Sequence, residues 1–73
     1  MPAAMGIETL IGRTGTVSVP LNPRGIVQIA GEQWTAELED GVDEALPRGA
    51  RIEVISLDGF KVIVRKPGFP PKA

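Results

Sequence analysis

The sequence contains neither cysteine nor histidine, and its aromatic residues are one tryptophan and two phenylalanines. Without cysteine no disulfide can staple the fold, and without either residue type a structural zinc site is not expected. No apolar run approaches the ~20 residues of a membrane-spanning helix, and the opening MPAAMG lacks the basic and apolar regions of a signal peptide. We therefore expect the chain itself to be soluble and to fold by packing and backbone pairing.

An excess of charge of either sign is also missing. Eight basic and nine acidic residues give a formal net charge of -1. A nucleic-acid-binding domain usually carries a basic surface that attracts the phosphate backbone, so this balance argues against nucleic acid as a partner. A chain of 73 residues is enough for one small domain, which buries only ~60% of the surface that the unfolded chain exposes.

The sequence does have apolar residues that alternate with polar ones, interrupted by glycine and proline at short intervals. This period of two predicts half-buried strands. The segment PLNPRG contains two prolines and is predicted to be a loop. Five segments are predicted strands: residues 12–19, two strands within residues 25–38, and residues 50–57 and 60–65.

The stretch GIVQIAGEQWTAEL predicts a β-hairpin. A two-residue loop at 31–32 places glycine at the first position of a type II′ turn. Trp34 then lies opposite Ile29, and Ala36 lies opposite Val27, so that one face of both strands is apolar. We therefore expect Trp34 to point into the core instead of serving as a stacking surface for a ligand.

A second hairpin is predicted near the C-terminus. The dipeptide Asp-Gly at 58–59 is a strong two-residue turn signal, and it places Leu57 opposite Phe60. The apolar face changes side between Val54 and Ile55, which predicts a β-bulge at this point.

Residues 37–44 carry five carboxylates and one glycine. They are predicted to form a solvated connection, with a helical turn at 43–46 as an option. The spacing of the acids lacks the regular ligand pattern of an EF-hand loop, which argues against a calcium site. Catalysis by paired carboxylates requires a cleft that shifts their pKa values, and none is indicated here.

Five short strands without an amphipathic helix predict an all-β protein, either a closed barrel or a roll. A barrel removes the exposed strand edges, so we predict a five-stranded antiparallel barrel of the OB-fold type with no substantial helix. Residues 10–66 are assigned to the barrel, residues 1–9 to a flexible N-terminal segment and residues 67–73 to a Pro-rich flexible tail. The alternative for the tail is that it serves as a Pro-rich docking ligand for a partner. The predicted core consists of Val17, Val19, Val27, Ile29, Trp34, Ala36, Leu38, Ile52, Val54 and Val62.

Several short motifs follow one another along the chain: LIGRTG at 10–15, LNPRG at 21–25, GEQWTA at 31–36, GARIEV at 49–54 and DG at 58–59. The distinctive part of this series is L-x-P-x-G followed by G-E-x-W-x-A. In this order the motifs, which cover about residues 10–65, resemble the C-terminal soluble domain of NfeD-like proteins.

The resemblance implies a non-enzymatic OB-fold module, without a cofactor, from a membrane protein. Family members typically place transmembrane helices before this domain, and the long forms add a serine protease domain of the ClpP class. No residue here matches the catalytic motif of that protease. The implied partners are stomatin-, flotillin- or prohibitin-like membrane scaffold proteins. Membrane association would come from the parent protein, with this domain on the cytoplasmic side.

Two functions therefore remain open: the protein-interaction module, and the generic OB-fold role of binding single-stranded nucleic acid or an oligosaccharide. The second function needs exposed aromatic side chains and a basic groove. Its candidates are Phe60, Phe69 and Trp34, with Arg13, Arg24, Arg48, Arg51, Lys61 and Arg65.

The predicted partner-binding loop consists of Asn22, Pro23 and Arg24, which occupy the place of an OB-fold binding loop; the acidic connection is the second choice. Arg24 can anchor a partner carboxylate through two hydrogen bonds, or it can be a solvated charge without a ligand. If it is an anchor, Arg24→Glu weakens partner binding and leaves thermal stability nearly unchanged.

Overall fold

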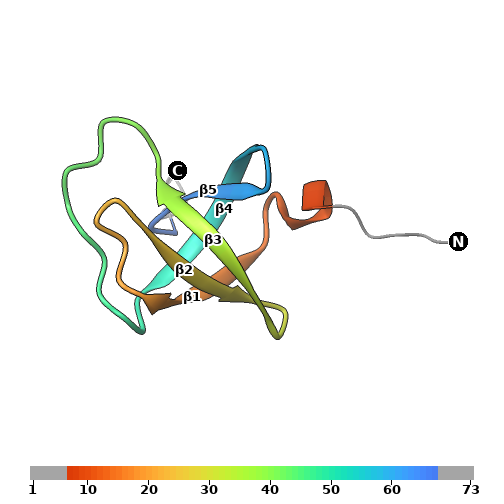
Figure 1. The fold of residues 1–73 in the computed structure, drawn as a ribbon, viewed down its shortest axis with the longest axis horizontal. Coiled ribbons are helices and arrows are strands. Elements are labelled where there is room, and N and C mark those ends of the chain that lie inside the picture. Colours follow the sequence, from red (N-terminus) through yellow and green to blue (C-terminus); the bar gives the residue numbers. More distant parts are fainter. Residues whose placement is uncertain (1–6, 68–73) are drawn as a thin grey trace, which may run out of the picture.

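The computed structural model describes residues 7–67, which form a closed five-stranded barrel with the strand order β1-β2-β3-β5-β4 (Figure 1). This confirms the all-β barrel that the sequence predicted. Four of its five strand pairs are antiparallel, but the closing pair of β3 and β5 is parallel. The elements are the 3-10 helix η1 (Ile7–Leu10) and the strands β1 (Thr14–Val19), β2 (Arg24–Ile29), β3 (Glu32–Leu38), β4 (Arg51–Asp58) and β5 (Lys61–Arg65).

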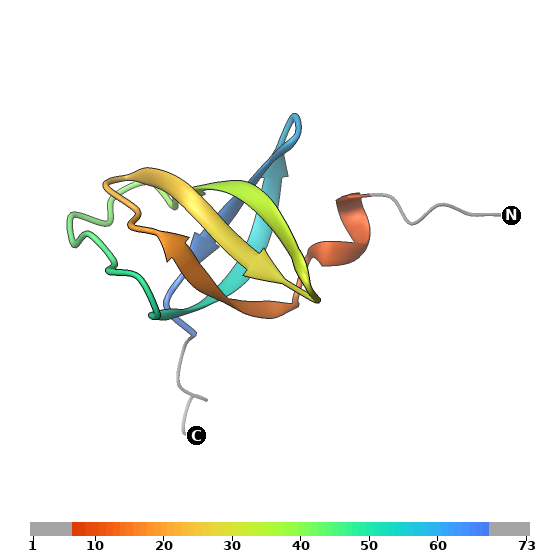
Figure 2. The same cartoon turned by 60° about the horizontal axis from the view of Figure 1, so that its bottom comes forward.

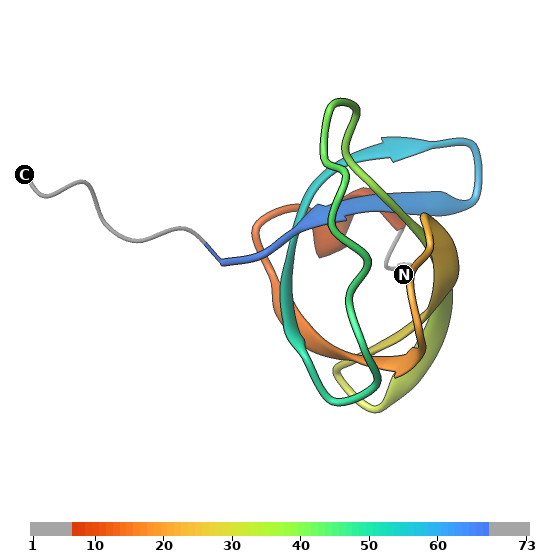
Figure 3. The same cartoon turned by 90° about the vertical axis from the view of Figure 1, so that its left-hand side faces the viewer.

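The two ends of the barrel are covered by different segments. The connection from β3 to β4 crosses one end, and η1 lies at the opposite end (Figures 1 and 3). The helical turn considered for 43–46 does not form, because the backbone of Leu46 bonds to Leu21 instead. The two residues exchange N–H···O bonds of 2.9 and 3.0 Å, and both side chains are buried.

The chain before β1 packs onto the barrel. Residues 7–9, which the sequence placed in the N-terminal segment, belong to η1, and Ile7 contacts the core. After η1, the amide of Gly12 donates to the carbonyl of Val54 at 2.9 Å, and the amide of Val54 donates to the carbonyl of Arg13 at 3.0 Å. The expectations for residues 1–6 and 68–73 lie outside the described residues.

The β2–β3 hairpin has a different turn from the predicted one. Its turn residues are Ala30 and Gly31, with φ angles of 54° and 83°, and Val27 lies opposite Trp34. Positive φ at both positions is the signature of a type I′ turn, whose twist matches that of the strands. The predicted turn at 31–32 and its register are therefore wrong, but each residue keeps its predicted face because the new pairing preserves the alternation.

The β4–β5 hairpin turns at Gly59, with φ of 68°, and Phe60. Asp58 pairs with Lys61, so the predicted turn at 58–59 is one residue too early. Leu57 accordingly lies opposite a valine of β5, not opposite Phe60. Glycine occupies the first turn position, as a type II′ turn prefers.

The bulge predicted in the fourth strand is confirmed. Val54 pairs with Val64 and Ser56 pairs with Ile63, so Ile55 is the extra residue between them. The β5 partners of Val54 and Ser56 are adjacent in the chain, and this irregularity bends β4 within the barrel.

Burial in the barrel interior follows the predicted list apart from Val19 and Trp34. Val19 is 47% exposed because the β1–β2 register shifts between Val17 and Val19, which ends the inward alternation. Trp34 is half-buried and packs against the core from one side. The buried cluster consists of Leu10, Val17, Leu21, Val27, Ile29, Ala36, Leu38, Leu46, Ile52, Val54, Val62 and Val64.

Candidate partner-binding surface

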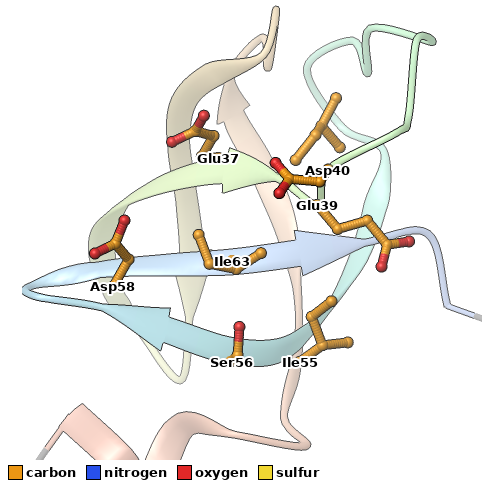
Figure 4. Close-up of a pocket in the computed structure, with 8 residues that line it drawn as sticks. Glu37, Glu39, Asp40, Ile55, Ser56, Asp58 and Ile63 are labelled. Atoms are coloured by element: carbon orange, nitrogen blue, oxygen red, sulfur yellow. The ribbon is translucent and has the colours of Figure 1, made fainter.

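A groove of about 360 Å³ runs along the outer face of β3, β5 and β4 (Figure 4). Figure 4 shows Asp58 at its hairpin end and Glu39 and Asp40 where the chain leaves β3. We call it the β5 groove. Its lining residues are Glu37, Leu38, Glu39, Asp40, Ile55, Ser56, Asp58 and Ile63.

The floor of the β5 groove is built by strand pairing. Glu37 of β3 is paired with Ile63 of β5, which in turn is paired with Ser56 of β4. These three side chains therefore form a row across the outer face. The bulge adds Ile55 beside Ser56, so two half-buried isoleucines and the buried Leu38 form the apolar part of a lining that is otherwise polar.

Charges near the hairpin end of the groove are paired. Lys61 Nζ lies 2.6 Å from Glu37 Oε1 and 3.6 Å from Asp58 Oδ2, and Arg24 Nε lies 3.7 Å from Glu37 Oε1. The hydrogen bond from Lys61 holds the pKa of Glu37 below its ordinary value, and the same bond raises the pKa of Lys61. Glu37 thus stays ionised and fixed in place.

Charges at the other end of the groove are not paired. Within residues 7–67, no basic side chain lies at ion-pair distance from Glu39 or Asp40. Lys61 and Arg24 compensate two of the four carboxylates that line the groove, so its potential is negative although the net charge of the chain is only -1.

The structure places the predicted loop Asn22, Pro23 and Arg24 beside the groove, not in it. All three residues are exposed, and the peptide bond between Asn22 and Pro23 is cis. The carbonyl of Pro23 accepts a 3.0 Å bond from the amide of Leu38. Only Arg24 reaches the groove, through its ion pair with Glu37, and this pairing removes part of its capacity to anchor a partner carboxylate.

The acidic connection, the second choice from the sequence, divides into two parts. Glu39 and Asp40 line the β5 groove, whereas Glu44 points elsewhere and lies 3.2 Å from Lys66 Nζ. Among the described residues, no group of three acidic side chains is arranged to hold a metal ion.

The candidates for stacking and phosphate binding form no single basic groove among the described residues: Arg13 and Trp34 line a common pocket, but Glu32 adds a carboxylate to it. Phe60 is 87% exposed at a hairpin tip, whereas Trp34 is half-buried with its indole N–H enclosed. Phe69 lies outside the described residues. Lys61, Arg24 and Arg65 each form an ion pair with a carboxylate. The positive charge that a basic groove would require on the outer face is therefore compensated at these three residues.

Sequence reasoning missed the β5 groove because β3 and β5 are far apart in the chain. Ile63 alternates with buried valines and reads as an outward residue, but its neighbours depend on the parallel pairing that closes the barrel. The phase change at Ile55 was the one local signal.

Fold and surface define a small barrel domain whose exposed, charged groove suits contact with another molecule. The family model described as the NfeD-like C-terminal, partner-binding domain matches residues 7–66. The chain belongs to this family, as its motifs indicated. None of the described helices is long and apolar enough to cross a membrane.

Two solved structures resemble the barrel. The C-terminal domain of stomatin operon partner protein 1510-C from Pyrococcus horikoshii has a TM-score of 0.79 and 32% identity, covering 90% of this chain and 100% of that one. The soluble domain of a membrane protein implicated in regulation of membrane protease activity from Corynebacterium glutamicum has a TM-score of 0.76 and 26% identity, covering 84% and 97%.

A longer relative is the membrane-bound protease PH1510 of Pyrococcus horikoshii. It is 36% identical over 62 residues, which is 85% of this chain but only 14% of that protein. The chain therefore corresponds to a small part of that relative.

Proposed function

We propose that this chain is a non-enzymatic interaction module that joins an NfeD-like membrane protein to a stomatin-, flotillin- or prohibitin-like scaffold protein. The observation that carries the proposal is the likeness to the domain from a stomatin operon partner protein, which is matched along its whole length. The family description as a partner-binding domain supports the same role. The likeness to a soluble domain of a membrane protein supports membrane association through the parent. The cytoplasmic side for this domain is part of the proposal and rests on the family resemblance alone.

The proposal that the domain is not itself an enzyme rests on the composition of its surface. The chain has no histidine or cysteine, and the carboxylates of the β5 groove are either held in ion pairs or open to solvent. None of them lies in an enclosed cleft of the kind that general acid or base catalysis requires.

A titration tests the proposed function. The purified chain is added to the purified soluble part of the stomatin-like protein from the same genome, and binding is followed by calorimetry. We expect saturable binding that an unrelated OB-fold domain of similar charge does not show. Absence of binding to stomatin-, flotillin- and prohibitin-like proteins alike would refute the proposed function.

A further inference from the structure

The β4–β5 hairpin presents an aromatic side chain to solvent. Phe60 is 87% exposed, whereas the other large exposed apolar residues, Ile11 and Val19, are only 50% and 47% exposed. A phenylalanine has few rotamers to lose on binding and a large apolar surface to bury, which suits it to anchor an interface. The hairpin tip projects from the barrel in Figures 1 and 2.

The residues beside Phe60 hold the hairpin in place. Asp58 and Lys61 are paired across the strands, and Lys61 is bonded to Glu37 on β3 at 2.6 Å. This contact ties the base of the hairpin to the barrel wall. A partner that binds Phe60 therefore loses little free energy in ordering the hairpin.

The β5 groove begins at the same hairpin. Asp58 lines one end, and the floor continues through Ile63 and Ile55 to the uncompensated Glu39 and Asp40 (Figure 4). Phe60 follows Asp58 by two residues, so the exposed aromatic belongs to the same hairpin that carries one end of the groove.

The chemistry of this surface selects its occupant. The isoleucines accept an apolar side chain, and the unpaired carboxylates favour lysine or arginine at positions next to it. The same carboxylates repel an anionic lipid surface, which argues against insertion of Phe60 into such a membrane.

We propose that the β5 groove and Phe60 together dock a basic, amphipathic segment of a protein partner. Apolar side chains of that segment lie on Ile55 and Ile63, its basic side chains face Glu39 and Asp40, and Phe60 enters an apolar pocket of the partner. The identity of that partner rests on the proposed function, but the chemistry of the surface is tested separately.

Matched variants test the surface. Asp40→Lys reverses a charge in the groove, and Asp43→Lys makes the same change nearby but outside the groove lining. Phe60→Ala removes the exposed aromatic, and Val19→Ala removes an exposed apolar side chain on a different face. All four are checked for unchanged thermal unfolding before use.

Two probes are titrated against each variant: the soluble part of the stomatin-like protein, and a fluorescein-labelled amphipathic peptide of leucine and lysine. For both, Asp40→Lys is expected to weaken binding about fivefold or more, and Asp43→Lys less than about twofold. For the protein probe, Phe60→Ala is expected to weaken binding about tenfold or more, with little effect of Val19→Ala.

The outcomes separate the two proposals. If the wild type binds the stomatin-like protein but neither Asp40→Lys nor Phe60→Ala weakens it, the docking surface is wrong and the proposed function stands. If the peptide binds with the expected pattern but none of the stomatin-, flotillin- and prohibitin-like proteins binds, the surface chemistry stands and the proposed function is wrong. An equal loss of affinity with Asp40→Lys and Asp43→Lys indicates nonspecific electrostatic attraction and overturns the proposal that the groove is the docking site. Phe60-dependent sedimentation with phosphatidylglycerol vesicles overturns the protein occupant.

Discussion

Glu37 Oε1 lies 2.6 Å from Lys61 Nζ, and this contact joins β3 to β5 where the barrel closes. Neither residue is fully exposed: their side chains are 26% and 23% exposed. The pair fixes one wall of the β5 groove and the base of the hairpin that carries Phe60.

The first prediction concerns pH. The pKa of Glu37 is lower in the fold than its ordinary value of 4.5, so the unfolded chain binds the proton more readily. The stabilising effect is therefore present above pH ~4.5 and is lost as pH falls through the lowered pKa of the folded state. Between pH 6 and pH 3, the free energy of unfolding measured with urea should fall further for the wild type than for Glu37→Gln.

A double-mutant cycle supplies the control for this prediction. Because the hydrogen bond from Lys61 is the main cause of the shift, Glu37→Gln should lose most of its pH-dependent effect in a Lys61→Met background. Unchanged pH dependence in that background would show that Lys61 is not the cause.

The second prediction concerns two glycines that lie against backbone. A Cβ at Gly25 would collide with the carbonyls of Val19 and Pro20, and a Cβ at Gly15 would collide with the carbonyl of Gln28. Because backbone cannot yield as a flexible side chain does, Gly25→Ala and Gly15→Ala should each cost about 3 kcal/mol or more. Thermal unfolding measures the loss.

Gly41→Ala is the comparison for this prediction. Gly41 has φ of 88° and open space around it, so alanine there meets conformational strain only, of about 1 kcal/mol. Equal losses at Gly41 and Gly25 would contradict the close-approach argument.

The third prediction concerns the turn of the β2–β3 hairpin. Ala30 has φ of 54°, a conformation that disfavours alanine and that asparagine adopts readily. Ala30→Asn creates the Asn-Gly pair preferred in type I′ turns and should stabilise the fold by about 0.5–1 kcal/mol. The midpoint of urea unfolding should rise without a change in slope; a fall would point to the predicted turn at 31–32 instead.

The fourth prediction concerns Trp34, which is half-buried with an indole N–H that is enclosed and has no hydrogen-bond partner among the described residues. Its partial exposure places the cost of Trp34→Ala at about 2–3 kcal/mol, below the ~3–5 kcal/mol of a fully buried aromatic. Trp34→Phe removes the unpaired donor, whose burial costs about 1–3 kcal/mol, and should be nearly neutral.

Unfolding of the Trp34 variants is followed by circular dichroism, because both lose the indole fluorophore. A loss of stability of similar size for Trp34→Phe and Trp34→Ala would show that the indole N–H finds a hydrogen-bond partner in solution.

The fifth prediction concerns Arg24, whose side chain is 68% exposed and 3.7 Å from Glu37. An exposed pair of this kind is worth about 0–1 kcal/mol, so Arg24→Glu should leave thermal stability nearly unchanged. Because it adds negative charge beside the β5 groove, it should strengthen binding of a basic segment in the calorimetric titration. Weaker binding would instead favour the loop of Asn22, Pro23 and Arg24 as the anchor for an acidic partner.

The sequence by itself determined the faces of the strands, apart from Val19 at the end of β1. Alternation with a period of two places Val27, Ile29 and Ala36 inside, and the break at Ile55 places the bulge, because both signals are local. The motif order was also sufficient for the family, which the comparisons confirm.

Only the tertiary structure decided which residues lie side by side. Both hairpin turns lie one residue away from their predicted positions. Such a move changes each cross-strand partner by two residues and leaves every side chain on its predicted face, so the apolar pattern cannot distinguish the two registers. The parallel pairing of β3 with β5 brings Glu37 next to Ile63, and the long connection brings Leu46 to Leu21. The β5 groove is made by such contacts between distant segments, because closing the barrel, and not any local preference, fixes them.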